Sequence, residues 1–271
     1  RSPPLNGKSG NLDIDKTTEM IPPAIQAGVH YYATAYGYHE QQSEVALGKV
    51  LTGGYRERVH IATKSPIWLI HESGDFDRLL DQQLQRLQTS SVDFYLLHAL
   101  NREHWAKAQQ FDLLRRAEAA KADGRIRHFG FSFHDNLETF KQIVDGYDAW
   151  DFCQIQYNYM DTTIQAGTEG LQYAAGKGLA VIIMEPLLGG KLALDLPATR
   201  PLWDSAAQKR TPADWALQWL WNQPEVSMVL SGMSTLEQVE QNIRSASTSG
   251  IGMLSAEEMK LVEQVREVVN S

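Results

Sequence analysis

The stretch GVHYYATAYGYHEQQSE, residues 28–44, changes character in its middle. Residues 29–35 are mostly β-branched, aromatic or small, which is typical of a strand, and an amphipathic helical pattern begins at Ser43. Between the two segments lie Tyr36 and Tyr38, separated by one glycine. The change predicts a buried strand that runs into a loop and then into a helix.

Six more short apolar runs alternate with helical patterns at intervals of about 30 residues. Several lack polar alternation, which is typical of parallel strands covered on both faces. The seven expected strands are 29–35, 59–64, 92–98, 126–132, 151–157, 179–185 and 226–232. This repetition favours one (β/α)₈ barrel domain over residues 1–271, and it disfavours an open sheet. The count is one strand short of eight, because residues 11–28 already have the pattern of the first helix and its exit.

Local signals place several helix ends. We expect one helix to run from about His104 to a glycine stop at Gly124. Thr211 followed by Pro212 is a typical helix start. Two Ser-x-x-Glu capping boxes predict further helix starts, at Ser234/Glu237 and Ser255/Glu258. Residues 189–210 form the longest connection without clear periodicity, and either a ligand-covering loop or a surface excursion would fit them.

Composition narrows the classes of function. The net charge of −8 argues against general nucleic-acid binding, and hydrophobic residues make up 43%, enough for a large core. The single cysteine, Cys153, allows neither an intrachain disulfide nor a cysteine metal site, so we expect a reducing cytoplasmic location. We see no run of 18 apolar residues and no signal peptide, and no histidine or carboxylate spacing typical of a metal site. The expected partner is therefore a small molecule, with oligomeric state left open.

Polar side chains close most of the expected strands. In a barrel of this kind, active sites lie at the carboxyl ends of the strands. Each residue alone has an ordinary explanation, such as a solvated lysine or a structural histidine. The joint occurrence of tyrosine, lysine and histidine on three successive strand ends is harder to explain in that way. The polar residues at strand ends are Tyr36, Tyr38, Lys64, His98, Ser132, Gln154 with Asn158, Glu185 and Ser231.

Tyr38, Lys64 and His98 suit proton transfer to a carbonyl oxygen. A tyrosine side chain is a poor acid at neutral pH because its pKa is about 10, and a nearby ammonium group lowers that value. A histidine can orient the carbonyl group while hydride arrives at carbon. Lys64 could instead form a Schiff base, as in aldolases, which would require no dinucleotide.

The order and spacing of seven segments resemble the aldo-keto reductase family over nearly the whole chain. The segments are AGVHYYATAYGYHEQQSEVALGKVL, IATKSP, VDFYLLH, GRIRHFGFSFHD, FCQIQYNYMD, MEPLLGGKLA and LSGMSTLEQVEQNI. The resemblance implies a (β/α)₈ barrel that moves hydride between a nicotinamide dinucleotide, NADP(H) or NAD(H), and a carbonyl or alcohol. It makes Tyr38, Lys64 and His98 three members of a catalytic tetrad. Family members usually begin with a short hairpin and a first barrel strand, and both are missing from this sequence. The subgroup that this chain resembles most closely often carries a C-terminal iron–sulfur region, and the cysteines of that region are absent here.

Ala33 stands where the family has the fourth member of the tetrad, an acid five residues before the tyrosine. The acid pairs with the lysine, and an unpaired buried charge costs on the order of several kcal/mol. We therefore expect Lys64 to lose its proton more easily or to turn toward water. Impaired catalysis with cofactor binding largely spared would follow. The alternative is a nucleotide-binding regulatory protein or pseudoenzyme of the same fold.

The resemblance also assigns a cofactor side. Its implied residues share two places, the ends of the central strands and the segment around the expected helix start at Ser234. Many members have an arginine for the 2′-phosphate of NADP where Gln238 stands, and a tyrosine stacked on the nicotinamide where Met184 stands. The implied residues are Ser132, Gln154, Met184, Glu185, Gly189, Gly190, Lys191, Ser231, Gly232, Met233, Ser234, Gln238, Gln241 and Asn242.

Overall fold

The computed structural model describes residues 14–270. Within them seven strands form one parallel sheet in sequence order, which confirms the expected strands and the missing first strand of the count. The strands are β1 (Tyr31–Ala33), β2 (His60–Ser65), β3 (Val92–Leu100), β4 (Ile126–Phe133), β5 (Phe152–Gln156), β6 (Ala180–Met184) and β7 (Met228–Val229).

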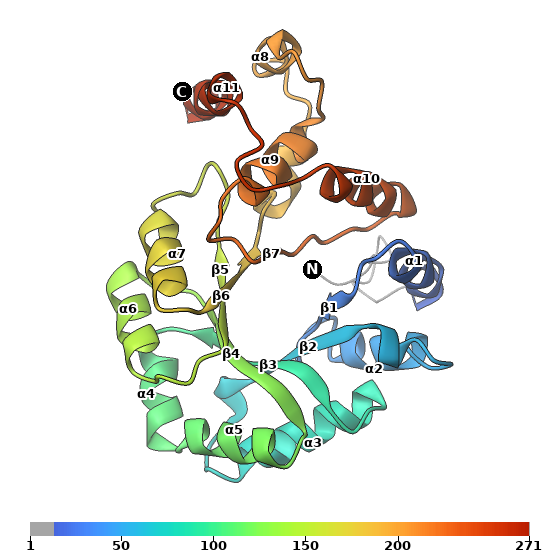
Figure 1. Cartoon of the computed structure of the whole chain (residues 1–271). Helices are drawn as coiled ribbons and strands as arrows, with labels where there is room; N and C mark the ends of the chain where they lie inside the picture. The colour runs from blue at the N-terminus through green and yellow to red at the C-terminus, as the bar shows by residue number, and fades with distance from the viewer. Residues whose placement is uncertain (1–13, 271) are drawn as a thin grey trace.

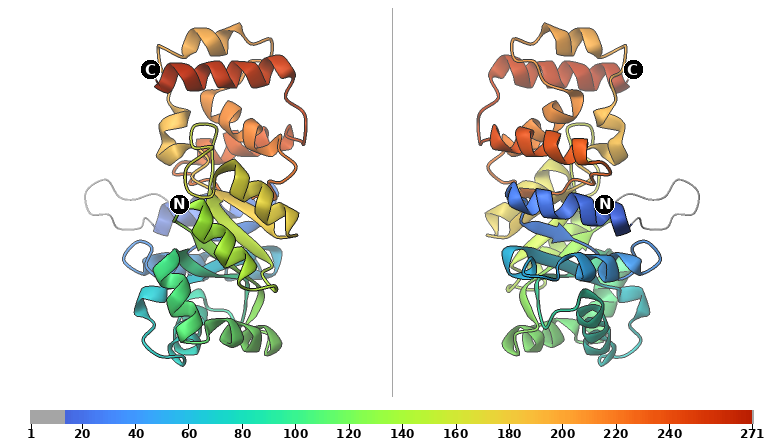
Figure 2. Two further views of the ribbon diagram at one scale, coloured as in Figure 1. Left: turned by 90° about the vertical axis from the view of Figure 1, so that its left-hand side faces the viewer. Right: turned by 90° about the vertical axis from the view of Figure 1, so that its right-hand side faces the viewer.

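Helices follow the strands and cover the outer side of the sheet (Figure 1). The α-helices are α1 (Ile14–Gln26), α2 (Gln42–Val50), α3 (Asp75–Leu87), α4 (Arg102–Gln110), α5 (Leu113–Ala122), α6 (Leu137–Asp145), α7 (Gly167–Gly176), α8 (Arg200–Ser205), α9 (Pro212–Trp221), α10 (Leu236–Ser247) and α11 (Ala256–Asn270). Three 3₁₀ turns are η1 (Arg56–Arg58), η2 (Ile67–Leu69) and η3 (Leu188–Ala193). Figure 2 shows α8 and α11 stacked at one end of the molecule.

The sheet curls into an incomplete barrel whose edges are β1 and β7 (Figure 1). Side chains alternate across each strand, so every second residue points inward. The inner cluster contains Ala62, Leu96, Phe152 and Ile182, with Tyr31 and others packed against it. The outer cluster, which includes Phe129 and Phe131, packs against the helices. Two packed layers therefore hold the strand ends at one rim.

An apolar groove lies between the two edge strands. β1 contributes Tyr31 and Ala33 to it, and β7 and the residue after it contribute Met228 and Leu230. Helices α1 and α10 contact each other across this interval, and both also line the groove. Ala33, where the resemblance predicts an acid, therefore faces a groove as well as the barrel interior.

Several local expectations are confirmed. Thr211 caps α9 by accepting a hydrogen bond from the amide of Asp214, and Pro212 begins that helix. The capping box at Ser255 and Glu258 forms in both directions. The connection over residues 189–210 contains most of η3 and the short helix α8.

Two expectations about helices are wrong. The helix after β7 is capped by Thr235, whose hydroxyl accepts from the amide of Gln238, so it does not start at Ser234. The side chain of Gln238 accepts from the Ser234 amide and thereby keeps Ser234 outside the helix. The expected helix from His104 to Gly124 is two helices, α4 and α5, because Asp112 adopts a left-handed conformation at φ 55°.

Gly130 of β4 allows the sheet to pack closely, and this gives a stability prediction. A β-carbon at Gly130 would overlap the Phe152 carbonyl and lie 2.8 Å from its ring, so Gly130→Ala should lower the free energy of unfolding by about 2 kcal/mol or more. Gly176→Ala, at an exposed helix position with no neighbour within 4 Å, should raise it slightly. Denaturant unfolding of both variants would measure this, and equal stabilities would contradict the packing described.

Candidate functional site

Three residues expected at strand ends come together at the rim. The Lys64 Nζ atom lies 4.9 Å from the centre of the Tyr38 ring. The rings of Tyr38 and His98 meet edge to face with centres 5.8 Å apart. Lys64 is the second-last residue of β2, His98 lies near the end of β3, and Tyr38 stands in the loop after β1. The curled parallel sheet thus places a phenol, an ammonium and an imidazole around one point.

Lys64 is only 2% exposed. Its ammonium donates a 2.7 Å hydrogen bond to the backbone carbonyl of Thr34, and in the described part of the chain it makes no ion pair. Ala33 pairs in register with Ala62, two residues before Lys64 on the same inner face. The expectation that Lys64 might turn toward water is wrong. A main-chain carbonyl holds it inside the barrel, although a carbonyl carries only a partial negative charge.

His98 has an uncharged imidazole at neutral pH. Burial, followed by the positive charge of Lys64, lowers the pKa of His98 to about 3. Its Nδ1 atom is buried without a hydrogen-bond partner among the described residues. A neutral ring that packs against Tyr38 can donate from one nitrogen to a carbonyl oxygen at the rim.

Ser132, Gln154 and Met184 form the inner wall next to this trio. The Ser132 hydroxyl oxygen accepts from the Ala99 amide at 2.8 Å, which leaves its own hydrogen available for donation. Gln154 donates to the sulfur of Met184 at 3.4 Å, and its Oε1 is buried without a partner in the described structure. A hydroxyl donor beside an unsatisfied amide acceptor is the arrangement that a ligand carboxamide would complete.

The turn after β6 is built around the carboxylate of Glu185. Its Oε2 accepts from the amide of Gly189 at 2.7 Å. Gly189 and Gly190 have φ values of 66° and 95°, conformations that other residues adopt only with strain. Lys191, which follows them, is exposed. This turn carries one exposed cation, Lys191, while the amides of Gly189 and Gly190 are bonded within the turn.

The segment after β7 is arranged by its own side chains. Asn242 donates to the Ser231 hydroxyl at 2.8 Å, and Gln241 donates to Glu237. Gly232 and Ser234 are exposed, whereas Met233 is partly buried and lines the groove. The residues that the sequence grouped here therefore do lie together, between the groove and the start of α10.

Two strand-end residues lie outside this arrangement. Tyr36 turns away from the rim toward α3, where its hydroxyl donates to Gln82 and its ring packs under the guanidinium of Arg86. Asn158 is fully buried and holds the backbone of its own loop and the carbonyl of Glu185. Both side chains are committed to structural contacts.

Comparison with known proteins identifies the family. A model of the aldo/keto reductase family matches residues 4–267. The chain belongs to the aldo-keto reductase family. It is 26% identical to L-galactose dehydrogenase of Arabidopsis thaliana over 99% of this chain and 89% of that protein. It is 24% identical to the NADH-specific methylglyoxal reductase of Escherichia coli, over 87% of this chain and 84% of that protein.

Solved structures show the same fold. An aldo-keto reductase from Bacillus halodurans in its holo form superposes with a TM-score of 0.79 at 21% identity, covering 97% of this chain and 91% of that chain. One from Klebsiella pneumoniae in complex with NADPH gives 0.77 at 22% identity, covering 97% and 90%. The half-barrel is thus the aldo-keto reductase barrel with β1 and β7 as edges in the described residues.

Sequence reasoning missed Trp68 as a site residue of this aldo-keto reductase. Its ring lies 5.3 Å from that of His98, and the side chain is 42% exposed in the turn η2. A tryptophan four residues after Lys64 was the available signal. In the described part of the chain no group of three His, Cys, Asp or Glu side chains could hold a metal ion, and no helix is long and apolar enough to cross a membrane.

The depressed pKa of His98 gives a pH prediction. The folded protein does not protonate His98 until about pH 3, whereas an unfolded chain protonates it near pH 6.5. Its contribution to stability is therefore complete above that pH and is lost as the pH falls from about 6.5 toward 3. Denaturant unfolding between pH 7 and 4 should show a steeper loss for the natural chain than for His98→Gln. Parallel curves would contradict a buried neutral His98, and His71→Gln, at an exposed histidine, is the control.

Proposed function

We propose that this chain is an NAD(P)-dependent oxidoreductase that transfers hydride between a nicotinamide cofactor and a small carbonyl or alcohol compound. The observation that carries the proposal is the meeting of Tyr38, Lys64 and His98 at the rim of an aldo-keto reductase barrel. We take residues 1–271 to act as one catalytic domain. The curated relatives support a sugar- or aldehyde-directed reaction, since their names include L-galactose dehydrogenase and methylglyoxal reductase.

The proposed cofactor site fits the residues present. The carboxamide of a nicotinamide would accept from Ser132 and donate to the unsatisfied Oε1 of Gln154. The phosphate groups would meet the turn of Gly189, Gly190 and Lys191 together with Gly232, Met233 and Ser234, and the adenosine end would meet Gln238, Gln241 and Asn242. When bound, the cofactor supplies or receives the hydride.

The choice between NADPH and NADH depends on the segment after β7. Gln238 stands where many family members carry an arginine, and its Oε1 already accepts from the Ser234 amide. A neutral amide that is engaged in this way offers no charge to a 2′-phosphate. The similarity to an NADH-specific reductase and to a structure with NADPH leaves both cofactors in the proposal.

The chain's own residues would handle the proton. Tyr38 would donate it to the carbonyl oxygen as hydride reaches carbon, and the ammonium of Lys64 would stabilise the phenolate left behind. Neutral His98 would orient the carbonyl oxygen by a hydrogen bond. Trp68 would exclude water on the side facing solvent.

Ala33 favours a second candidate function, that of a nucleotide-binding regulatory protein with little turnover. A carboxylate at this position would neutralise Lys64, and the carbonyl of Thr34 replaces it only in part. Without a full countercharge, both the position and the charge of Lys64 are held less firmly. We propose that chemistry is impaired while the nucleotide site is retained.

The nucleotide site can be tested apart from the chemistry. NADPH or NADH should quench the fluorescence of the chain's seven tryptophans with saturation, because Trp68 lies at the rim. Tyr38→Phe should leave the dissociation constant within about twofold and abolish any carbonyl reduction. Failure of both dinucleotides to bind the natural chain would remove the basis for an oxidoreductase.

Restoring the acid tests the role of position 33. Ala33→Asp should raise kcat at least about tenfold, equivalent to roughly 1.4 kcal/mol of barrier, because the carboxylate would pair with Lys64. Ala33→Asn, of nearly the same size but neutral, should not. Steady-state reduction of a panel of small aldehydes, monitored by cofactor absorbance, would measure both. An equal gain in the two variants would show that filling the groove, and not the charge, was responsible.

A further inference from the structure

The turn that carries Tyr38 is strained. Three residues directly after it, His39, Glu40 and Gln41, have φ values of 50°, 52° and 68°, although none of them is glycine. Left-handed conformations cost about 1–2 kcal/mol per residue for side chains other than glycine. Other contacts must therefore hold this turn, or Tyr38 would not keep a fixed place beside Lys64.

Arg86, on helix α3, contacts both ends of the turn. Its Nη1 donates to the carbonyl of Tyr36 at 3.4 Å, and its guanidinium lies 4.1 Å from the centre of the Tyr36 ring. Its Nη2 donates to the side-chain oxygen of Gln41 at 2.6 Å. The planar fork of a guanidinium can make these contacts together, and an ammonium cannot. Arg86 thus spans the turn from the residue before Gly37 to the last strained residue.

The same guanidinium is tied to the strand that carries Lys64. Glu44, which is fully buried, pairs with Arg86 at 3.3 Å through Oε2. Its Oε1 accepts from the Thr63 hydroxyl at 2.5 Å and from Gln83 at 2.6 Å. Gln83 also donates to the carbonyl of Lys64 at 3.0 Å. One buried polar network therefore contacts the main chain of Lys64 and the turn of Tyr38.

This network lies behind the site. Thr63 and Lys64 are neighbours on β2, so their side chains point to opposite faces, Lys64 into the barrel and Thr63 toward α2 and α3. Glu44, Gln83 and Arg86 consequently reach the site only through main-chain and turn contacts. They cannot act as acid, base or ligand for a substrate at the rim.

We propose that the ion pair of the buried Glu44 and the partly exposed Arg86, linked to Lys64 by Gln83, is a positioning device that fixes Tyr38 relative to Lys64. This inference rests on the proposed function, since it assigns the separation of these two groups a role in proton transfer. Because position 33 supplies no acid on the inner face, the anchorage of Lys64 falls to Thr34 inside and to this network outside.

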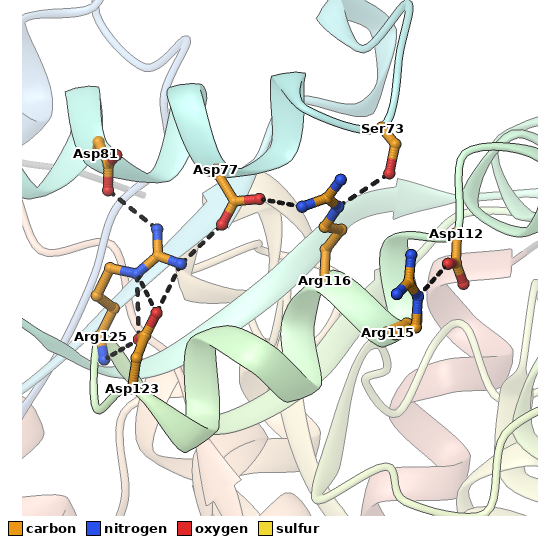
Figure 3. Close-up of polar contacts among 8 residues, drawn as sticks. All are labelled: Ser73, Asp77, Asp81, Asp112, Arg115, Arg116, Asp123 and Arg125. Atoms are coloured by element: carbon orange, nitrogen blue, oxygen red, sulfur yellow. Dashed lines mark hydrogen bonds and ion pairs between the residues drawn. The ribbon is translucent and has the colours of Figure 1, made fainter.

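The same helix offers a matched control. Asp77 of α3 pairs with Arg125 and Arg116, whose further partners are Asp81, Asp123 and Ser73 (Figure 3). This second network joins α3 to α5 and its exit, and none of its contacts reaches Tyr38 or Lys64. Asp77→Asn therefore weakens a charged network of the same helix without touching the turn.

The test compares Arg86→Lys, Gln41→Met, their double variant and the control Asp77→Asn, each in the natural chain and in Ala33→Asp. Arg86→Lys keeps a cation for Glu44 but loses the planar guanidinium. Gln41→Met removes only the exposed contact between Gln41 and Arg86. Both variants should therefore fold. We expect Arg86→Lys to lower kcat about tenfold and Gln41→Met about threefold. The Michaelis constant and the cofactor dissociation constant should stay within twofold. The solvent deuterium isotope effect on kcat should rise, because proton transfer from Tyr38 becomes slower.

The outcomes separate this inference from the proposed function. Asp77→Asn should lower the melting temperature with kcat unchanged. The double variant Arg86→Lys/Gln41→Met should lose no more kcat than Arg86→Lys alone, since Arg86→Lys already removes the contact with Gln41. If kcat in the Arg86 and Gln41 variants falls no further than in Asp77→Asn, or the isotope effect stays constant, the positioning role is overturned. The proposed oxidoreductase function is not affected by that result. If neither Ala33→Asp nor the natural chain turns over any carbonyl compound, the proposed function fails, and the positioning role fails with it.

Discussion

The hydrogen bond from Lys64 to the carbonyl of Thr34 is the contact on which the candidate site depends. A buried ammonium group without a full negative charge nearby is costly, and the usual remedies are a carboxylate partner or exposure to water. Lys64 takes neither in the described structure. The main chain of an edge strand holds it instead, so the geometry of β1 directly sets the place of the charge. The low pKa of His98 follows in part from that charge.

The open edge of the sheet bears on the same contact. Thr34 follows β1, and its amide donates to Ala62 of β2, so β1 is held from one side by main-chain bonds. On its other side lies the groove shared with Met228 and Leu230. The hydroxyl of Tyr31 is buried without a hydrogen-bond partner among the described residues, so this groove contains an unsatisfied polar group. Position 33, where the family resemblance predicts an acid, is therefore also part of the wall of this groove.

The sequence was sufficient for the repeated features of the fold and for the trio at the rim. Strand-forming runs followed by amphipathic helices recur, so β1 to β7 and their parallel order could be predicted, and so could the meeting of Tyr38, Lys64 and His98. The main-chain partner of Lys64 could not be predicted in this way. Every residue has a carbonyl, and only the strand register places that of Thr34 beside Lys64. The start of α10 was missed since Ser234 and Thr235 are both good caps, and the side chain of Gln238, which accepts from the Ser234 amide, decides between them. The left-handed residues 39–41 lack the glycines that usually reveal such a turn.

Alternation of side chains along β1 and β2 separates the charges at the rim from the contacts that hold its shape. A strand places its side chains on two faces, and so the inner face can change its chemistry without altering the outer contacts. Ala33 places no carboxylate on the inner face of β1, whereas Thr63 of β2, one residue before Lys64, is bonded to Glu44 on the outer face. The strand register, the helices α2 and α3 and the turn of Tyr38 therefore form without an acid at position 33. Geometry and charge at this rim are supported by different residues, and a change in turnover here need not be accompanied by a change in fold.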